Sequence, residues 1–207
     1  HRFDIAIEAD LIEEVSRVYG YNNLPVTTPV SALRMLEAPE AAVKQFSMKK
    51  MLAARGYHEA ITYSFVDEDL QDLLNSNDLA VRLKNPLSAD MAVMRTSLWS
   101  GLLKSAAYNQ NRQQSRVRLF ELGMVFRQSG ENLCMESLDQ ELRISGVITG
   151  RRRPENWADT DEEVDFYDLK GDVEYLLGSD PAQGYEFHPC EHPALQTGQS
   201  ARVLRNG

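Results

Sequence analysis

Four carboxylates near the start of the chain have the residue types and the spacing of a site for a hard divalent cation. They are Asp4, Asp10, Glu13 and Glu14. Residues three and four apart share one face of a helix, so the last three of these acids point into one region. Asp4 precedes Asp10 by six residues and can return to that region from a preceding strand. Because Mg²⁺ prefers carboxylate oxygens, the pattern is compatible with a magnesium site.

The segment that carries these acids predicts a short amphipathic helix. Its apolar residues recur at helical spacing; they are Leu11, Ile12, Val15, Val18 and Tyr19. Asp10 stands where an N-cap belongs, Glu13 follows at the spacing of a capping box, and Gly20 suits the end of a helix. Acids at a helix N-terminus are also favoured by the helix dipole, so ordinary capping explains the same residues without a metal.

Five further sequence blocks follow this helix. They are Lys84–Ser88, Val93–Leu98, Arg118–Gly123, Asp165–Asp172, and His192–Leu195 leading to Gly198–Ala201. In this order, and together with residues 2–21, they resemble the β subunits of bacterial phenylalanyl-tRNA synthetases along the whole chain. The resemblance implies that the four carboxylates bind Mg²⁺ at the contact with the α subunit.

The resemblance also implies a function for the whole enzyme. It charges tRNA(Phe) with phenylalanine using ATP and Mg²⁺; the α subunit makes the aminoacyl adenylate, and two α and two β subunits assemble. The β subunit provides scaffold, tRNA contacts and editing, and the regions for editing and anticodon contact are not in this sequence. A class II catalytic site needs an arginine followed two residues later by glutamate. The nearest match is Phe126–Ser129, where serine replaces the acid. Since no glycine-rich helix start with an arginine occurs either, we expect a catalytic-like fold without catalysis.

The composition and charge of the chain argue against some classes of protein. The 207 residues contain no apolar run long enough to cross a membrane. No signal peptide opens the chain, and two cysteines favour a reducing compartment, so we expect a cytoplasmic protein. The net charge is −9, and residues 155–174 alone hold nine acids and one lysine. This acid excess opposes binding of nucleic acid by bulk electrostatics.

The pattern of elements predicts an α+β fold in which helices flank an antiparallel sheet of the class II synthetase type. We expect residues 1–30 to be the end of a small helical domain and its linker, and residues 37–207 to be the core domain, truncated at its C-terminus. Beyond the first helix, the predicted helices are 39–55, 68–74, 98–112 and 167–177. The predicted strands are 58–65, 79–83, 116–126, 142–149, 184–188 and 201–204.

Two other features have competing interpretations. Trp157 lies beside an acidic run, where it is either part of a small cluster under a loop or an interface anchor. His188, Cys190 and His192 alternate, but a zinc site needs a fourth ligand, so a strand end and a turn are the simpler interpretation.

Two alternative functions remain open at this stage. One is a degenerate synthetase paralogue that activates an amino acid by itself, which the missing glycine-rich arginine helix opposes. The other is an RNA-binding module, which the acid excess opposes.

Overall fold

The structure is a computed structural model that describes residues 4–32, 45–75, 79–128, 138–158, 160–178 and 184–205. The chain forms two compact units, residues 1–42 and 43–207. The predicted domain limits, 1–30 and 37–207, stay predictions. Among the described residues, no helix is both long enough and apolar enough to cross a membrane.

The first unit contains the predicted amphipathic helix. Helix α1 spans Glu8–Tyr19, and a short 3₁₀ helix, η1, follows at Tyr21–Asn23. Gly20 ends α1 at a positive φ of 97°, and its N–H donates to the Ser16 carbonyl at 2.9 Å. The helix begins two residues before Asp10, so the prediction of Asp10 as N-cap is wrong. No residue of α1 is buried within this unit.

The second unit is built on one long strand pair. Strands β4, Arg116–Gln128, and β5, Leu138–Gly150, pair antiparallel through thirteen residues each, and β1, His58–Glu59, adds a short parallel edge to β4. Two smaller antiparallel pairs complete the strands: β2, Phe65–Val66, with β3, Val93–Met94; and β6, Tyr185–Pro189, with β7, Ala201–Arg205. The predicted α+β class with antiparallel pairing is confirmed.

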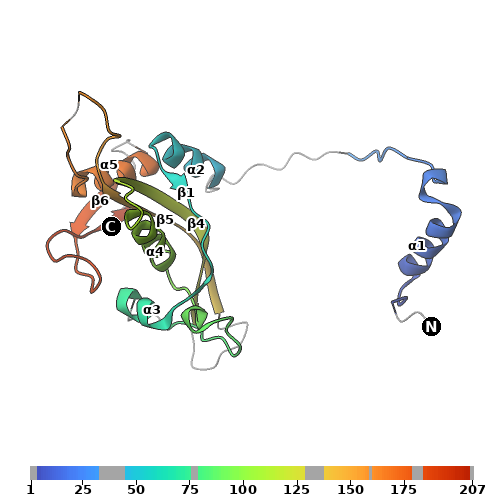
Figure 1. Cartoon of the computed structure of the whole chain (residues 1–207). Coiled ribbons are helices and arrows are strands. Elements are labelled where there is room, and N and C mark those ends of the chain that lie inside the picture. Colours follow the sequence, from blue (N-terminus) through green and yellow to red (C-terminus); the bar gives the residue numbers. More distant parts are fainter. Residues whose placement is uncertain are drawn as a thin grey trace. The chain divides into compact units, whose positions relative to one another are not determined.

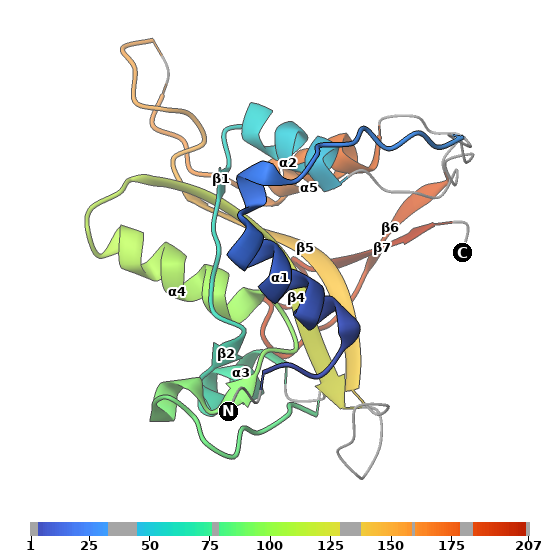
Figure 2. The ribbon, with the colours of Figure 1, turned by 90° about the vertical axis from the view of Figure 1, so that its right-hand side faces the viewer.

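Helices cover both faces of the β4–β5 ladder. The helices of this unit are α2, Gln45–Ala54; α3, Glu68–Asn75; α4, Trp99–Gln110; and α5, Phe166–Leu177, with a 3₁₀ helix, η2, at Ala89–Met91. In both ribbon views α2 and α5 lie side by side near one face of the ladder, whereas α4 lies near the other (Figures 1 and 2).

Each face of the ladder has its own apolar cluster. On the α2 and α5 face, buried Leu52, Tyr57 and Phe120 pack with Ile144 and Ile148. The α4 face has a second cluster, consisting of Leu98, Leu102, Val125, Leu119 and Val147. Successive residues of a strand point to opposite faces, so Leu119 and Phe120 serve different clusters.

The segment predicted as one strand, 58–65, is split between β1 and β2. The reason is a contact with a residue distant in sequence: the Thr62 N–H donates to the Glu121 carboxylate at 3.3 Å, and the Thr62 hydroxyl donates to the same carboxylate at 2.8 Å. A side chain therefore satisfies backbone that a ladder would otherwise pair. The predicted strand at 79–83 is also wrong, because only an isolated bridge joins Arg82 to Val93. The predicted helix at 39–55 begins outside the described residues, and α2 accounts for its second half.

One buried ion pair lies on each face of the ladder. Arg118, on the α5 face, contacts Asp172 at 3.1 Å, and Asp172 also accepts bonds from Arg55 Nε and the Tyr57 hydroxyl, both at 2.6 Å. Burial and the hydrogen bond to Asp172 raise the pKa of Tyr57, so its hydroxyl stays a donor. On the α4 face, Arg95 Nη1 contacts Glu121 Oε1 at 2.7 Å, and both side chains are at most 4% exposed.

We predict that Asp172→Ala lowers the free energy of unfolding by about 3–5 kcal/mol, because it leaves the buried Arg118 guanidinium without its carboxylate. Urea unfolding monitored by circular dichroism measures this. Glu174→Ala is the matched control on the same helix, since its pair with Lys170 is partly exposed and is expected to contribute less than about 1 kcal/mol. Equal effects of the two substitutions would contradict the role assigned to Asp172.

Candidate functional site

The predicted metal ligands lie in and just before α1, where Asp10 and Glu14 each bind other groups of the chain. Asp10 Oδ2 accepts hydrogen bonds from the backbone N–H groups of Ala6 at 2.8 Å and Ile7 at 2.9 Å, and these bonds lower the pKa of Asp10. Glu14 Oε2 accepts from Arg17 Nη2 at 2.8 Å. Asp4 and Glu13 are exposed. Asp10 is the third residue of α1, and its carboxylate therefore caps the N–H groups of the two residues that precede the helix.

The structure does not gather these four acids. Within the described ranges, no group of three or more Asp, Glu, His or Cys side chains is placed to hold a metal ion. The donor set has the right chemistry for Mg²⁺, since all four ligands are carboxylates. Its arrangement in this chain alone serves helix capping and an ion pair, so the magnesium site stays a prediction.

A cavity of about 440 Å³ opens on the α4 face of the ladder. Its polar lining includes Arg127 from β4, Arg143 and Ser145 from β5, and His192, which contacts the Trp99 ring edge to face at 5.3 Å. Arg143 donates to Glu141 Oε2 at 2.6 Å, and this bond, more than the nearby charge of Arg127, lowers the pKa of Glu141.

Arg127 is the arginine of Phe126–Ser129, the segment that most nearly matches the arginine motif of a class II catalytic site. The structure puts it in the cavity wall, and none of the described residues that line this cavity is Asp or Glu. Nucleoside triphosphates are used with Mg²⁺, which binds through carboxylates and phosphates. The described part of the lining thus offers positive charge but no carboxylate for that metal.

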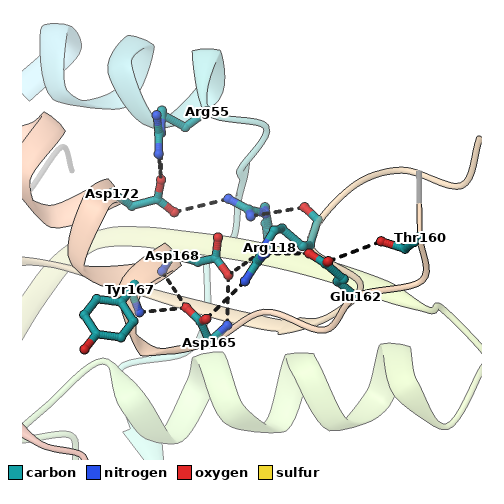
Figure 3. A network of polar contacts seen from close by, with 9 residues as sticks. Arg55, Arg118, Thr160, Glu162, Asp165, Tyr167, Asp168 and Asp172 are labelled. Carbon is teal, nitrogen blue, oxygen red and sulfur yellow. Dashed lines mark hydrogen bonds and ion pairs between the residues drawn. The ribbon is translucent and has the colours of Figure 1, made fainter. Parts of the chain in front are cut away.

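A third cluster joins the acid-rich segment to the start of α5 (Figure 3). The carboxylate of Asp165 caps α5 by accepting from the N–H groups of Tyr167 at 2.8 Å and Asp168 at 3.0 Å, and Asp168 accepts from Asp165 N–H at 2.9 Å. This is a reciprocal capping box. Arg152 contacts the carboxylates of Glu162 at 2.6 Å, Asp165 at 3.0 Å and Asp168 at 2.9 Å.

Sequence reasoning gave no role to the charged residues that hold the core. Arg95, Arg118, Glu121 and Asp172 all fall inside the blocks that carry the family resemblance. The sequence contained a signal for this role, because Arg118 and Glu121 interrupt an apolar β-rich run. Charged side chains are almost never fully buried unless they are paired, so charges in a buried strand indicate ion pairs. The identity of each partner required the tertiary structure.

We predict that Asp168 stabilises the fold in a pH-dependent way. Desolvation raises its pKa, but the bonds from Asp165 N–H and Arg152 outweigh this and leave it lowered from 3.8. The charged form therefore stabilises the fold above the unfolded value, and this stabilisation is lost as the pH falls through the lower folded value. Asp168→Asn should reduce the unfolding free energy by about 1 kcal/mol at neutral pH.

Urea titrations of the two proteins at neutral and strongly acidic pH measure this difference, which should disappear in acid. Glu155→Gln is the control, because that side chain is 82% exposed and lies 3.6 Å from Arg151. A difference that persists unchanged in acid would show that the Asp168 charge is not responsible.

Comparison with known proteins agrees with the resemblance seen in the sequence. Residues 24–207 match the family described as the phenylalanyl-tRNA synthetase beta chain CLM domain. The phenylalanine–tRNA ligase beta subunit of Hahella chejuensis is 49% identical over 207 residues, which cover 100% of this chain and 25% of that relative. The corresponding subunit of Colwellia psychrerythraea is 50% identical over 210 residues, with coverage of 100% and 26%.

This chain thus spans about a quarter of the length of these curated relatives. Among solved structures, a pyrrolysyl-tRNA synthetase of Desulfitobacterium hafniense gives a TM-score of 0.43 at 14% identity, covering 69% of this chain and 47% of the other. A likeness that remote adds nothing to the assignment. Because the family match covers most of its length, the chain belongs to the phenylalanyl-tRNA synthetase beta-chain family.

Proposed function

We propose that this chain is a non-catalytic scaffold part of the beta subunit of phenylalanine–tRNA ligase. It supports the attachment of phenylalanine to tRNA(Phe), which the α subunit carries out in the cytoplasm with ATP and Mg²⁺. Two α and two β subunits make up the assembly. The family match over residues 24–207 is the observation on which this proposal depends.

The cavity supports the non-catalytic part of the proposal. A site that activates an amino acid must hold ATP together with its metal ion, and Mg²⁺ is bound through one or two carboxylates as well as the phosphates. Arg127 and Arg143 line the cavity, and no acid is among its lining residues within the described part of the chain. The buried acid on the same face, Glu121, is already paired with Arg95 and Thr62. In this proposal the class II-like core has a structural role and not a catalytic one.

The proposal includes the magnesium site in a form that depends on assembly. Asp4, Asp10, Glu13 and Glu14 would hold Mg²⁺ at the contact with the α subunit, where the cation neutralises acids that otherwise repel one another. Three of them recur at helical spacing on α1. Since Asp10 and Glu14 have other partners in this chain alone, we propose that the set closes on the metal only when the α subunit is present.

We predict that Asp10→Asn and Glu14→Gln weaken association of the full-length beta subunit with the α subunit at least tenfold in magnesium buffer. Each amide keeps an oxygen that accepts the bonds seen here but removes the charge that a cation needs. Glu8→Gln is the matched control, an acid of the same helix outside the proposed set. Biolayer interferometry with and without EDTA measures the association.

EDTA should weaken the wild-type complex and change the two variants little. Association that does not respond to EDTA would remove the metal from the interface and leave Asp10 as a helix cap. A wild-type beta subunit that does not bind the α subunit at all would overturn the proposed function itself.

We also predict that Arg127→Ala and Arg143→Ala leave aminoacylation of tRNA(Phe) by the assembled enzyme within about twofold of wild type, a change of at most about 0.4 kcal/mol. The reason is that these arginines line a cavity in which no described residue is an acid that could hold the metal ion of ATP. Steady-state kcat/KM for tRNA charging is the measurement, and circular dichroism confirms that the variants fold. A fall of a hundredfold or more would assign the cavity to catalysis and favour the degenerate-synthetase alternative.

A further inference from the structure

The segment after β5 displays a tryptophan in full contact with solvent. Trp157 is 98% exposed. Both ribbon views show the orange segment around it projecting away from the body of its unit (Figures 1 and 2). A tryptophan ring carries a large apolar surface whose removal from water is favourable.

The arms of this projection are held together by backbone hydrogen bonds. Arg152 N–H donates to the Glu162 carbonyl at 2.8 Å, and Val164 N–H donates to the Gly150 carbonyl at 2.9 Å. An isolated antiparallel bridge joins Arg151 to Glu163 between these two contacts. The two arms, residues 150–152 and 162–164, are therefore paired as the base of a hairpin.

Side chains brace the same hairpin across its width. Arg151 contacts Asp161 at 2.8 Å and Glu155 at 3.6 Å, and Arg152 contacts Glu162 at 2.6 Å. Next to the tryptophan, the Asn156 amide donates to the Pro154 carbonyl at 3.0 Å, and its oxygen accepts from Ala158 N–H at 2.9 Å. These bonds restrain the backbone of residues 154–158, which reduces the entropy lost on binding.

The charge around Trp157 selects the kind of partner. Its neighbours Glu155, Asp161 and Glu162 keep side-chain exposures of 82%, 63% and 58% even though they are paired. The hairpin itself, residues 151–163, holds five acids and three arginines and so keeps a net charge of −2. This field repels nucleic acid phosphates and attracts a protein surface rich in lysine and arginine.

From the ordered hairpin, the exposed ring and the acidic surround, we propose that Trp157 is a docking anchor for another protein subunit. It inserts into an apolar pocket rimmed by basic side chains on the α subunit; the identity of that partner rests on the proposed function. Tryptophan is among the residues that dominate binding energy at interfaces, and a ring of polar contacts around such an anchor excludes water. The acids of the hairpin form that ring.

The test uses the full-length beta subunit and the α subunit, with biolayer interferometry at two salt concentrations. We expect Trp157→Ala to weaken association at least tenfold and Trp157→Phe to retain most of it. Ile61→Ala is the matched control: it removes another apolar side chain of the same unit, 91% exposed, and should change nothing. The paired change Glu155→Gln with Asp161→Asn should slow association and reduce its dependence on salt.

The outcomes separate the two proposals. Wild-type protein that binds the α subunit as tightly as Trp157→Ala does would overturn the anchor and leave the proposed function intact. Failure of wild-type protein to bind the α subunit would overturn the proposed function, and this inference with it. Loss of tRNA(Phe) binding by Trp157→Ala, with α-subunit binding unchanged, would also overturn the anchor and assign the hairpin to RNA.

Discussion

The fold of the second unit depends on two carboxylates that are buried on opposite faces of one strand pair. A charged group removed from water is tolerated only when a partner of opposite charge and further hydrogen bonds compensate for it. Glu121 obtains this from Arg95 and Thr62, and Asp172 obtains it from Arg55, Tyr57 and Arg118. Sliding β4 by one residue would carry Arg118 and Glu121 to the wrong faces at once, so the pairs also specify the strand register.

This constraint explains why the family-like blocks have the residues they have. The block 93–98 supplies Arg95, the block 118–123 supplies Arg118 and Glu121, and the block 165–172 ends on Asp172. Gly123 belongs to the same logic, because a Cβ there would collide with the Arg95 guanidinium beside Glu121. The charged residues of these blocks hold helices against the sheet.

Prediction from the sequence succeeded for elements whose signals are local. It failed where a side chain distant in sequence determines the backbone structure. The long strands around 116–126 and 142–149 and the helix ending before Gly178 follow from apolar periodicity and turn residues, and the structure contains them. The break at Thr62 could not be predicted, because it depends on a carboxylate 59 residues away. Asp10 was expected to be the N-cap residue of the helix, but it lies inside the helix and accepts hydrogen bonds from the N–H groups of Ala6 and Ile7, which precede it.

The buried pairs also bear on the exposed hairpin, because one continuous path of contacts connects them. Asp172 ties α5 to Arg118 on β4, and α5 begins at the capping box of Asp165 and Asp168 (Figure 3). Arg152 contacts both of those acids and also Glu162 on the far arm of the hairpin, while its carbonyl accepts from Arg118 Nη2 at 3.4 Å. The two arms of the hairpin are therefore connected through Arg152 to the buried pair of Arg118 and Asp172. The proposed scaffold role needs this property, since a proposed anchor can hold a partner only as firmly as the core holds the anchor.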